Sequence, residues 1–76
     1  DDAVKVGKNF VLEAGDSITL KTGSASITMK KDGTISIEGK DINIKASGDL
    51  NQAASGKINV KASGDVVIKG SKVLNN

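Results

Sequence analysis

Lysine and aspartate are the residues of this chain that could do chemistry, and both recur at fixed places in its pattern. The chain has 11 lysines and 9 acidic residues but neither histidine nor cysteine. The carboxylates are therefore the only candidate acid–base groups, and no hydroxyl has a base near it in the pattern. A His-x-His metal-binding motif is also absent. We expect no catalytic residue, no bound metal, no cofactor and no enzymatic activity.

The charged residues flank pairs of aliphatic residues. A lysine follows the second aliphatic residue at Lys21, Lys30, Lys45, Lys61 and Lys69. An aspartate directly precedes the first position of the expected strand at Asp16, Asp41, Asp49 and Asp65. Mixed charge of this kind is typical of a solvated β surface, and the alternative is charge pairing across strands that sets their register. A net charge of +2 without arginine argues against a nucleic-acid partner.

The elements that carry these charges alternate apolar and polar residues with a period of two. Each aliphatic pair places two side chains on one face of a short strand. The pairs are Ile18 and Leu20, Ile27 and Met29, Ile35 and Ile37, Ile42 and Ile44, Ile58 and Val60, and Val66 and Ile68. Because isoleucine and valine favour strands, and the chain has no proline, we expect an all-β fold.

The pairs recur at a nearly constant spacing, which indicates an internal repeat. From Ile18 to Ile42 the steps are nine, eight and seven residues, and from Ile42 to Val66 every step is eight. Gln52 is the one polar residue in the second aliphatic column. In a trimer it would form a ring of three amides, which is either satisfied locally or serves as a register lock.

Small residues close each unit of the repeat. The predicted corners are at Gly39, Gly48, Gly56, Gly64 and Gly70. Glycine permits a sharp change of direction without a Cβ clash. Each repeat unit of about eight residues, here called an octad, is therefore predicted to form a strand of about five residues followed by a tight corner.

Three chains wound about one axis accommodate such a short unit. Each chain would lay one strand on a face, turn the corner and lay the next strand on the adjacent face. The expected fold is an intertwined homotrimeric β-helix or β-prism built from octapeptide repeats. Its axis would be lined by Ile18, Leu20, Ile27, Met29, Ile35, Ile37, Ile42, Ile44, Leu50, Gln52, Ile58, Val60, Val66 and Ile68.

We expect three regions: a lead-in strand over 1–14, the octad shaft over 15–71 and a C-terminal tip over 72–76. An antiparallel meander is the alternative architecture, and it is favoured mainly over residues 1–35, where the spacing wavers. Its turns would lie at Asp32–Gly33 and within the stretch KTGSAS.

The octads resemble the C-terminal β-helix shaft of the VgrG family of type VI secretion spike proteins. That shaft is similar to the trimeric β-helix of the phage T4 cell-puncturing protein, which carries a Val-x-Gly repeat of eight residues. The counterparts in this chain are IEG at 37–39 and IKG at 68–70, with the relaxed versions IKA at 44–46 and VKA at 60–62. The resemblance covers roughly residues 15–76.

The resemblance implies a rigid homotrimeric spike that a contractile machine drives through a target membrane. Val73, Leu74, Asn75 and Asn76 would seat a PAAR-repeat cap protein at the tip, with a frayed terminus as the alternative. Secreted effectors would travel with the spike, and N-terminal domains outside this chain would join it to the inner tube protein. The spike would assemble in the cytoplasm and leave through the type VI system without a signal peptide, to reach the extracellular space or the target-cell envelope.

Two other functions are compatible with a repeat of this kind. A trimeric shaft of a phage tail fibre or adhesin would serve receptor binding, although this chain has one aromatic residue for contact with a carbohydrate. An ice-binding solenoid would need a flat array of threonines, which the outward lysines interrupt.

Overall fold

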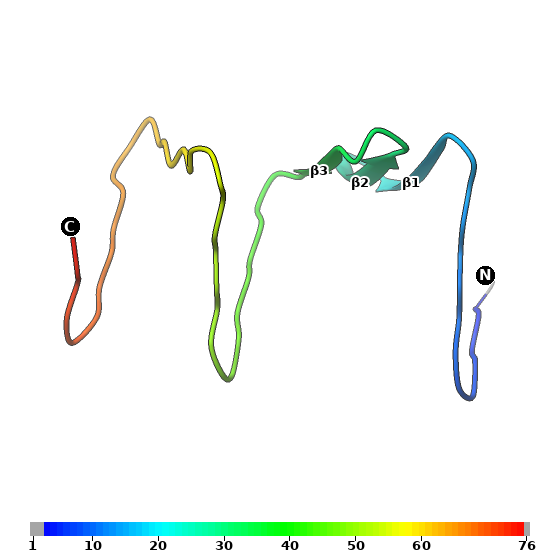
Figure 1. Cartoon of the computed structure of the whole chain (residues 1–76), viewed down its shortest axis with the longest axis horizontal. Helices are drawn as coiled ribbons and strands as arrows, with labels where there is room; N and C mark the ends of the chain where they lie inside the picture. The colour runs from blue at the N-terminus through cyan, green and yellow to red at the C-terminus, as the bar shows by residue number, and fades with distance from the viewer. Residues whose placement is uncertain (1–2, 76) are drawn as a thin grey trace. The chain divides into compact units, whose positions relative to one another are not determined.

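The computed structural model of the chain describes residues 3–75. The chain divides into two units, Asp1–Ile44 and Lys45–Asn76, and Figure 1 shows strands in the first unit. The described residues contain three β-strands and no helix, which confirms the all-β prediction. They accordingly contain no helix that could cross a membrane.

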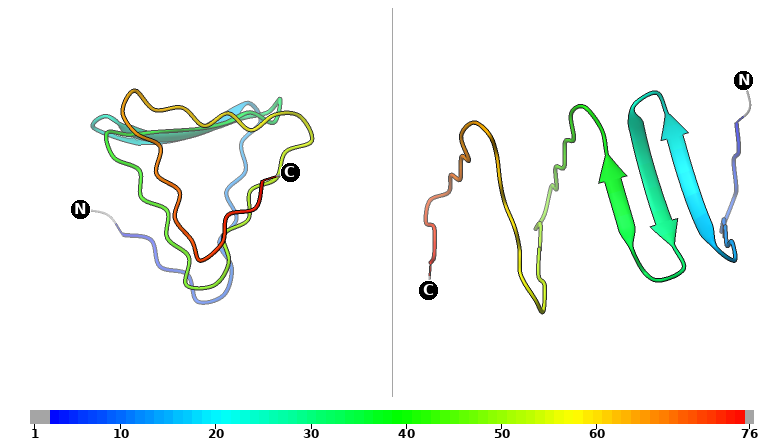
Figure 2. Two further views of the ribbon diagram at one scale, coloured as in Figure 1. Left: turned by 90° about the vertical axis from the view of Figure 1, so that its left-hand side faces the viewer. Right: turned by 90° about the horizontal axis from the view of Figure 1, so that it is seen from above.

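The first unit contains a three-stranded antiparallel sheet in the order β1-β2-β3. Its strands are β1 (Ser17–Thr22), β2 (Ala25–Lys30) and β3 (Ile35–Glu38), and they lie side by side in Figure 2. All three strands alternate aliphatic residues with polar ones, as a sheet with one apolar face requires. Between Ser17 and Glu38 the chain therefore forms the meander, and not one strand on each successive face.

Two glycine turns explain why these strands fold back on one another. Gly23 has a φ of 56° at the first central position of the two-residue turn between β1 and β2. Gly33 has a φ of 96° and closes the three-residue turn between β2 and β3. Both values lie in the left-handed region, which glycine enters without a steric penalty. The local turn chemistry thus holds successive repeats in one sheet.

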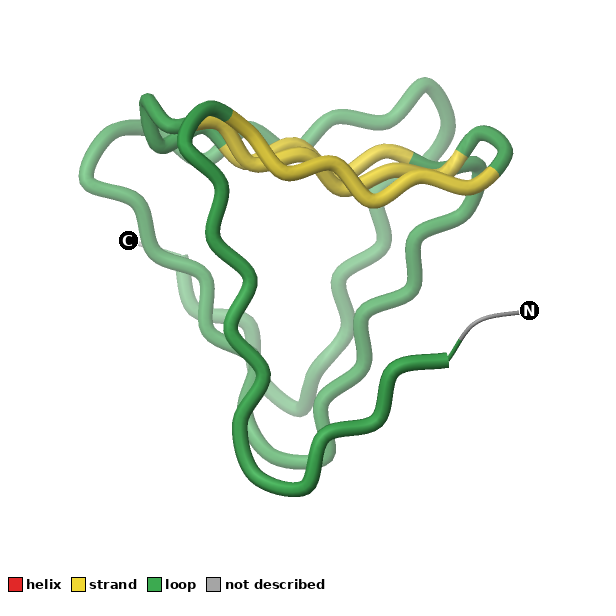
Figure 3. Tube along the Cα trace, turned by 90° about the vertical axis from the view of Figure 1, so that its right-hand side faces the viewer, coloured by secondary structure: helices red, strands yellow, loops and turns green. Residues whose placement is uncertain are grey.

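The segments before β1 and after β3 both lie on the same side of the plane of the sheet. The segment before β1 and the segment after β3 descend from opposite ends of the strands, as Figures 2 and 3 show. The backbone bends at residues 40–41, just after β3. Within the first unit, the two segments that flank the sheet therefore lie on one side of it, and the other side carries neither of them.

The second unit consists of runs of backbone joined by bends at residues 47–48, 55–56, 63–64 and 71 (Figure 1). Among residues 45–75 there is no strand and no backbone–backbone hydrogen bond. The bends nevertheless recur every eight residues from 47–48 to 63–64, which is the period of the sequence repeat.

Candidate functional site

The apolar face of the sheet carries two rows of aliphatic side chains. The register aligns Leu20 with Ile27 and Ile27 with Ile37, which makes the first row. It also aligns Ile18 with Met29 and Met29 with Ile35, which makes the second. Six of the predicted axis residues therefore lie on one face, and the opposite face carries polar residues such as Thr19, Thr28 and Ser36.

No described residue of the single chain is buried. Ile27 and Met29, although they lie on the central strand, remain 42% and 40% exposed. The accessible surface of the chain is 8165 Å², whereas a folded monomer of 7.7 kDa exposes about 4,300 Å². A large exposed apolar surface is typical of a site of interaction. The aliphatic rows are thus the candidate functional surface.

A hollow of about 580 Å³ lies at one end of this surface. Leu20, Ile27 and Ile37 line it together with Ile42, which follows the bend after β3. A Cβ added at Gly39 would lie 3.7 Å from Ile42 Cγ1 and 4.0 Å from Ala25 Cβ, which is ordinary contact distance. The bend after Gly39 therefore brings Ile42 alongside the apolar row of the sheet.

The remaining predicted axis residues are not brought together within the described chain. Ile44 ends the first unit and is 65% exposed. The axis residues of the second unit have no strand partner among residues 45–75; they are Leu50, Gln52, Ile58, Val60, Val66 and Ile68. Their proposed place on an axis stays a prediction.

The predicted corner glycines lie at or next to bends of the backbone. Gly48, Gly56 and Gly64 are themselves bend residues, and the bends near Gly39 and Gly70 begin one residue later. None of these five glycines has a positive φ. A Cβ at Gly48, Gly56 or Gly64 would meet nothing within 4 Å. The single chain therefore does not require glycine at these three bends, and their role as prism corners stays a prediction.

The predicted tip residues are exposed where the structure describes them. Val73 and Leu74 are 60% and 80% exposed, and Asn75 is also exposed. Asn76 lies outside the described residues. Two adjacent apolar side chains are thus available for contact near the C-terminal end of the second unit.

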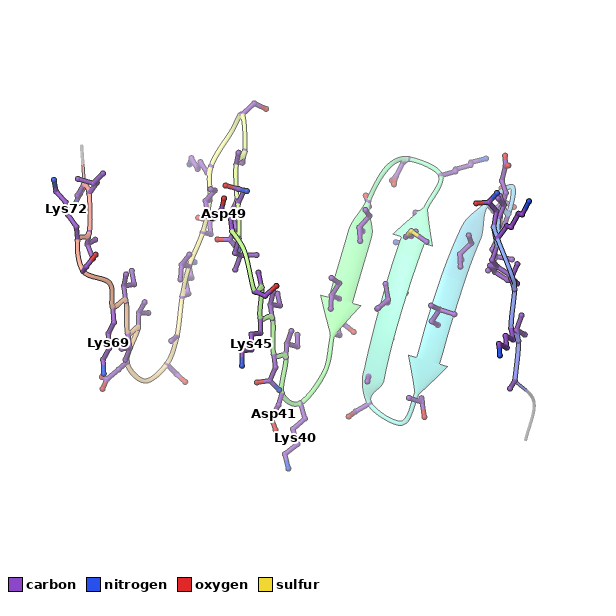
Figure 4. The ribbon with its side chains drawn as sticks, turned by 90° about the horizontal axis from the view of Figure 1, so that it is seen from below. Lys40, Asp41, Lys45, Asp49, Lys69 and Lys72 are labelled. Atoms are coloured by element: carbon purple, nitrogen blue, oxygen red, sulfur yellow. The ribbon has the colours of Figure 1, made fainter. Side chains whose placement is uncertain are left out.

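One ion pair joins charged side chains among residues 3–75, between Lys31 and Asp16. The sequence pattern indicated Asp16 but not Lys31. The signal was available, because Asp16 and Lys31 lie seven residues outward on either side of the Gly23–Ser24 turn. The charged residues labelled in Figure 4 form no ion pair within the described chain: Lys40, Asp41, Lys45, Asp49, Lys69 and Lys72. Charge pairing therefore occurs at one position of the meander.

The turn between β2 and β3 holds a carboxyl group whose pKa is lowered, that of Asp32. The backbone N–H of Thr34 donates a hydrogen bond of 3.0 Å to Oδ1 of Asp32. This bond, with a further one from the Thr34 side chain, holds the pKa of the Asp32 carboxyl below its usual range. The interaction is that of an Asx turn, so Asp32 has a structural explanation.

No cluster of potential metal ligands is found among residues 3–75. Of the carboxylates near the sheet, Asp32 serves the turn and Asp16 the ion pair already described. What the described arrangement can do is present apolar rows and strand edges to another protein chain.

A comparison with curated proteins gives one similarity that bears on function. Over 35 residues, or 46% of this chain, the sequence is 71% identical to the type VI secretion system spike protein VgrG1b of Pseudomonas aeruginosa. The matched segment spans 5% of the length of that relative. No protein-family model and no solved structure matches the chain. The resemblance to VgrG spike proteins predicted from the octads is confirmed for this segment.

Proposed function

We propose that this chain is a segment of the shaft of a type VI secretion spike, and that three copies intertwine to form it. The observation that carries the proposal is the 71% identity over 35 residues to a spike protein. The role is mechanical: a stiff trimeric needle that pierces a target membrane, with no catalytic function of its own.

The exposed surface of the single chain supports assembly with copies of itself. The chain exposes roughly 3,800 Å² more than a compact monomer of its mass would. Obligate homo-oligomers bury areas of this order, and their interfaces resemble a divided hydrophobic core. Three copies with their aliphatic rows facing one axis would remove this surface from water and leave the polar faces outside.

The proposal extends to partners at the tip. Val73, Leu74, Asn75 and Asn76 of three copies would form a platform for a PAAR-repeat cap protein, and effectors would travel with the assembly. The exposure of Val73 and Leu74 supports this part of the proposal. The shaft would be connected to the inner tube through N-terminal domains of a longer protein, and it would be exported by the type VI system.

Native mass spectrometry tests the trimer directly. We expect a mass of about 23 kDa, three times the 7.7 kDa of the chain. Interlocked strands also predict slow dissociation, so an unheated sample in SDS should migrate as the trimer. A monomer mass at micromolar concentration would overturn the proposal.

Co-elution with a PAAR-repeat protein tests the tip. We expect the trimer to bind it and a variant without residues 72–76 to lose binding while keeping the native mass of a trimer. A variant with Lys5→Gln and Lys8→Gln, at the other end of the chain, is the matched control and should bind. Equal binding by the truncated variant would assign the contact elsewhere.

A further inference from the structure

The turn between β2 and β3 contains the one Asp-Gly pair of the sequence, Asp32 and Gly33, and the sequence has no Asn-Gly pair. The peptide nitrogen that follows an aspartate can attack the side-chain carboxyl group of that aspartate. A Cβ on the following residue hinders this approach, and every other aspartate of the chain is followed by a residue that has one. The attack is therefore least hindered at Gly33.

The hairpin itself requires this glycine. Gly33 has a φ of 96°, in the left-handed region that other residues avoid. A Cβ added at Gly33 would meet nothing within 4 Å, and both residues of the pair are exposed to water. The turn thus places the carboxyl group of Asp32 next to a peptide nitrogen that no side chain shields.

We propose that Asp32 is a site of isomerisation to isoaspartate, and that the closed turn holds this reaction back. In the first step the nitrogen of Gly33 forms a bond to Cγ of Asp32. The hydroxyl group of the neutral carboxyl leaves Cγ, takes the amide proton and departs as water. In the second step water adds to the main-chain carbonyl carbon of the cyclic imide and breaks its bond to the nitrogen of Gly33. The chain then continues through Cγ, with no net gain or loss of atoms and no redox partner.

Two hydrogen bonds of the folded turn oppose the first step. The N–H of Gly33 donates a bond of 3.0 Å to the carbonyl oxygen of Lys30, and the nitrogen must give up this bond before it can lose its proton. The N–H of Thr34 donates a bond of 3.0 Å to Oδ1 of Asp32, which holds the carboxyl group toward Thr34. Attack on Cγ therefore requires the turn to open.

The ionisation of Asp32 acts in the same direction. The bond from the backbone N–H of Thr34 is the main cause that keeps the pKa of this carboxyl group below its usual range. An ionised carboxylate has no hydroxyl group to lose as water, so the reaction proceeds through the neutral acid. The folded turn lowers the share of that acid at neutral pH, and an open turn restores it.

Isomerisation would separate β3 from its place beside β2. An isoaspartate adds one atom to the backbone path, because the chain passes through Cβ and Cγ. The three-residue turn sets the pairing of Met29 with Ile35, and the bond from Gly33 to Lys30 closes it. A longer turn cannot keep both, so the strand register would be lost. The reaction thus leaves a lasting chemical record of each opening that led to it.

A digest with endoproteinase Asp-N locates the reaction, because this enzyme cleaves before aspartate and not before isoaspartate. The chain is incubated in neutral buffer, with and without guanidinium chloride, and then digested for mass spectrometry. We expect peptide 16–40 to appear in place of peptides 16–31 and 32–40. Its accumulation should be about tenfold faster in guanidinium chloride, where both hydrogen bonds of the turn are open. Cleavage before Asp41 and Asp49 should stay complete and is the internal control.

Two variants separate the reaction from effects of the denaturant. Asp32→Ser offers Thr34 an oxygen acceptor but has no carboxyl group. Protein isoaspartyl methyltransferase, with S-adenosylmethionine as methyl donor, should label the incubated unsubstituted chain and not this variant. Thr34→Pro has no N–H to donate to Asp32, so it should isomerise faster than the unsubstituted chain in buffer alone.

The outcomes are separate from those of the proposed function. Equal labelling of Asp32→Ser and the unsubstituted chain would overturn the assignment of the site. Equal rates with and without guanidinium chloride, or no acceleration by Thr34→Pro, would overturn the protection by the turn. Neither readout depends on the number of copies, so a monomer mass would overturn the trimer and leave this inference standing.

Discussion

The carboxylate of Asp16 lies 3.4 Å from the ammonium group of Lys31, just before the start of β1 and just after the end of β2. The backbone N–H of Lys31 also donates a hydrogen bond of 3.0 Å to the carbonyl oxygen of Asp16. The two contacts extend the ladder by one residue beyond the pair of Ser17 and Lys30. Both side chains are highly exposed, with 89% of Asp16 and 73% of Lys31 accessible to water.

Lys31→Gln should lower stability only slightly. An exposed ion pair contributes about 0–1 kcal/mol, and the backbone hydrogen bond does not depend on the lysine side chain. Urea unfolding of the assembled protein measures the change. Lys40→Gln, which removes a lysine without an ion pair in the described chain, is the control. A loss several times larger than 1 kcal/mol per chain would indicate that Lys31 has a further role.

Gly33→Ala should destabilise the turn between β2 and β3 by about 1–2 kcal/mol per chain, because alanine resists the left-handed conformation. Gly33 has a φ of 96°, whereas Gly48 has no positive φ, and a Cβ added there would meet nothing within 4 Å. Gly48→Ala should therefore leave the unfolding midpoint nearly unchanged. The reverse order of the two effects would show that neighbouring copies crowd the bend at Gly48.

The turn at Asp32 should weaken in acid. Its pKa is lower in the folded chain than in the unfolded chain, so its contribution is complete above the ordinary carboxyl pKa of about 4. The contribution is lost as the pH falls through the lowered folded pKa. Asp32→Asn keeps a neutral acceptor. The stability advantage of the unsubstituted chain over this variant should therefore shrink as the pH falls from about 5 to about 2, which is roughly the range over which the carboxyl group titrates. An advantage that is constant across this range would contradict the assignment.

Ile27→Asn should prevent assembly, because Ile27 lies in the middle of an aliphatic row on the central strand. Burying an amide without a partner costs about 1–3 kcal/mol in each of three copies, besides the lost apolar contact. Thr28→Asn is the matched control, since it adds an amide on the polar face of the same strand. Native mass spectrometry should find monomers for the first variant and trimers for the second. Trimers for both would mean that the rows do not face the axis.

Gln52→Val should raise the thermal unfolding midpoint and allow trimers with shifted register. Three amides on an axis carry a desolvation cost that valine removes, while one polar layer favours a single alignment of chains. Size-exclusion chromatography of the variant should give a heterogeneous trimer in place of one homogeneous species. Unchanged stability together with unchanged homogeneity would remove both claims about Gln52.

The strands of the sheet could be predicted from the sequence, but their arrangement only in part. Alternation identified Ile18 and Leu20, and the pairs that follow, as residues sharing a face. The turn at Asp32–Gly33 was also visible, since an Asp-Gly pair between alternating segments favours a hairpin. The octad period nevertheless favoured one strand per face, because spacing does not distinguish a strand that turns a corner from one that folds back. The left-handed φ of Gly23 and Gly33 decides between them.

The residues of the candidate surface could be predicted from the sequence, but their exposure in the single chain could not. The aliphatic columns were recognised, but in one chain all of their described members stay accessible. In the trimer proposed above, their burial would come from contacts between copies, which a single chain does not show. The ion pair was missed for a related reason, since its register follows from a turn that the octad period disregards.

A hairpin contributes two strands, and two strands add about 10 Å to a shaft. Because β1 and β3 run in the same direction, the added hairpin leaves the direction of the chain beyond the sheet unchanged.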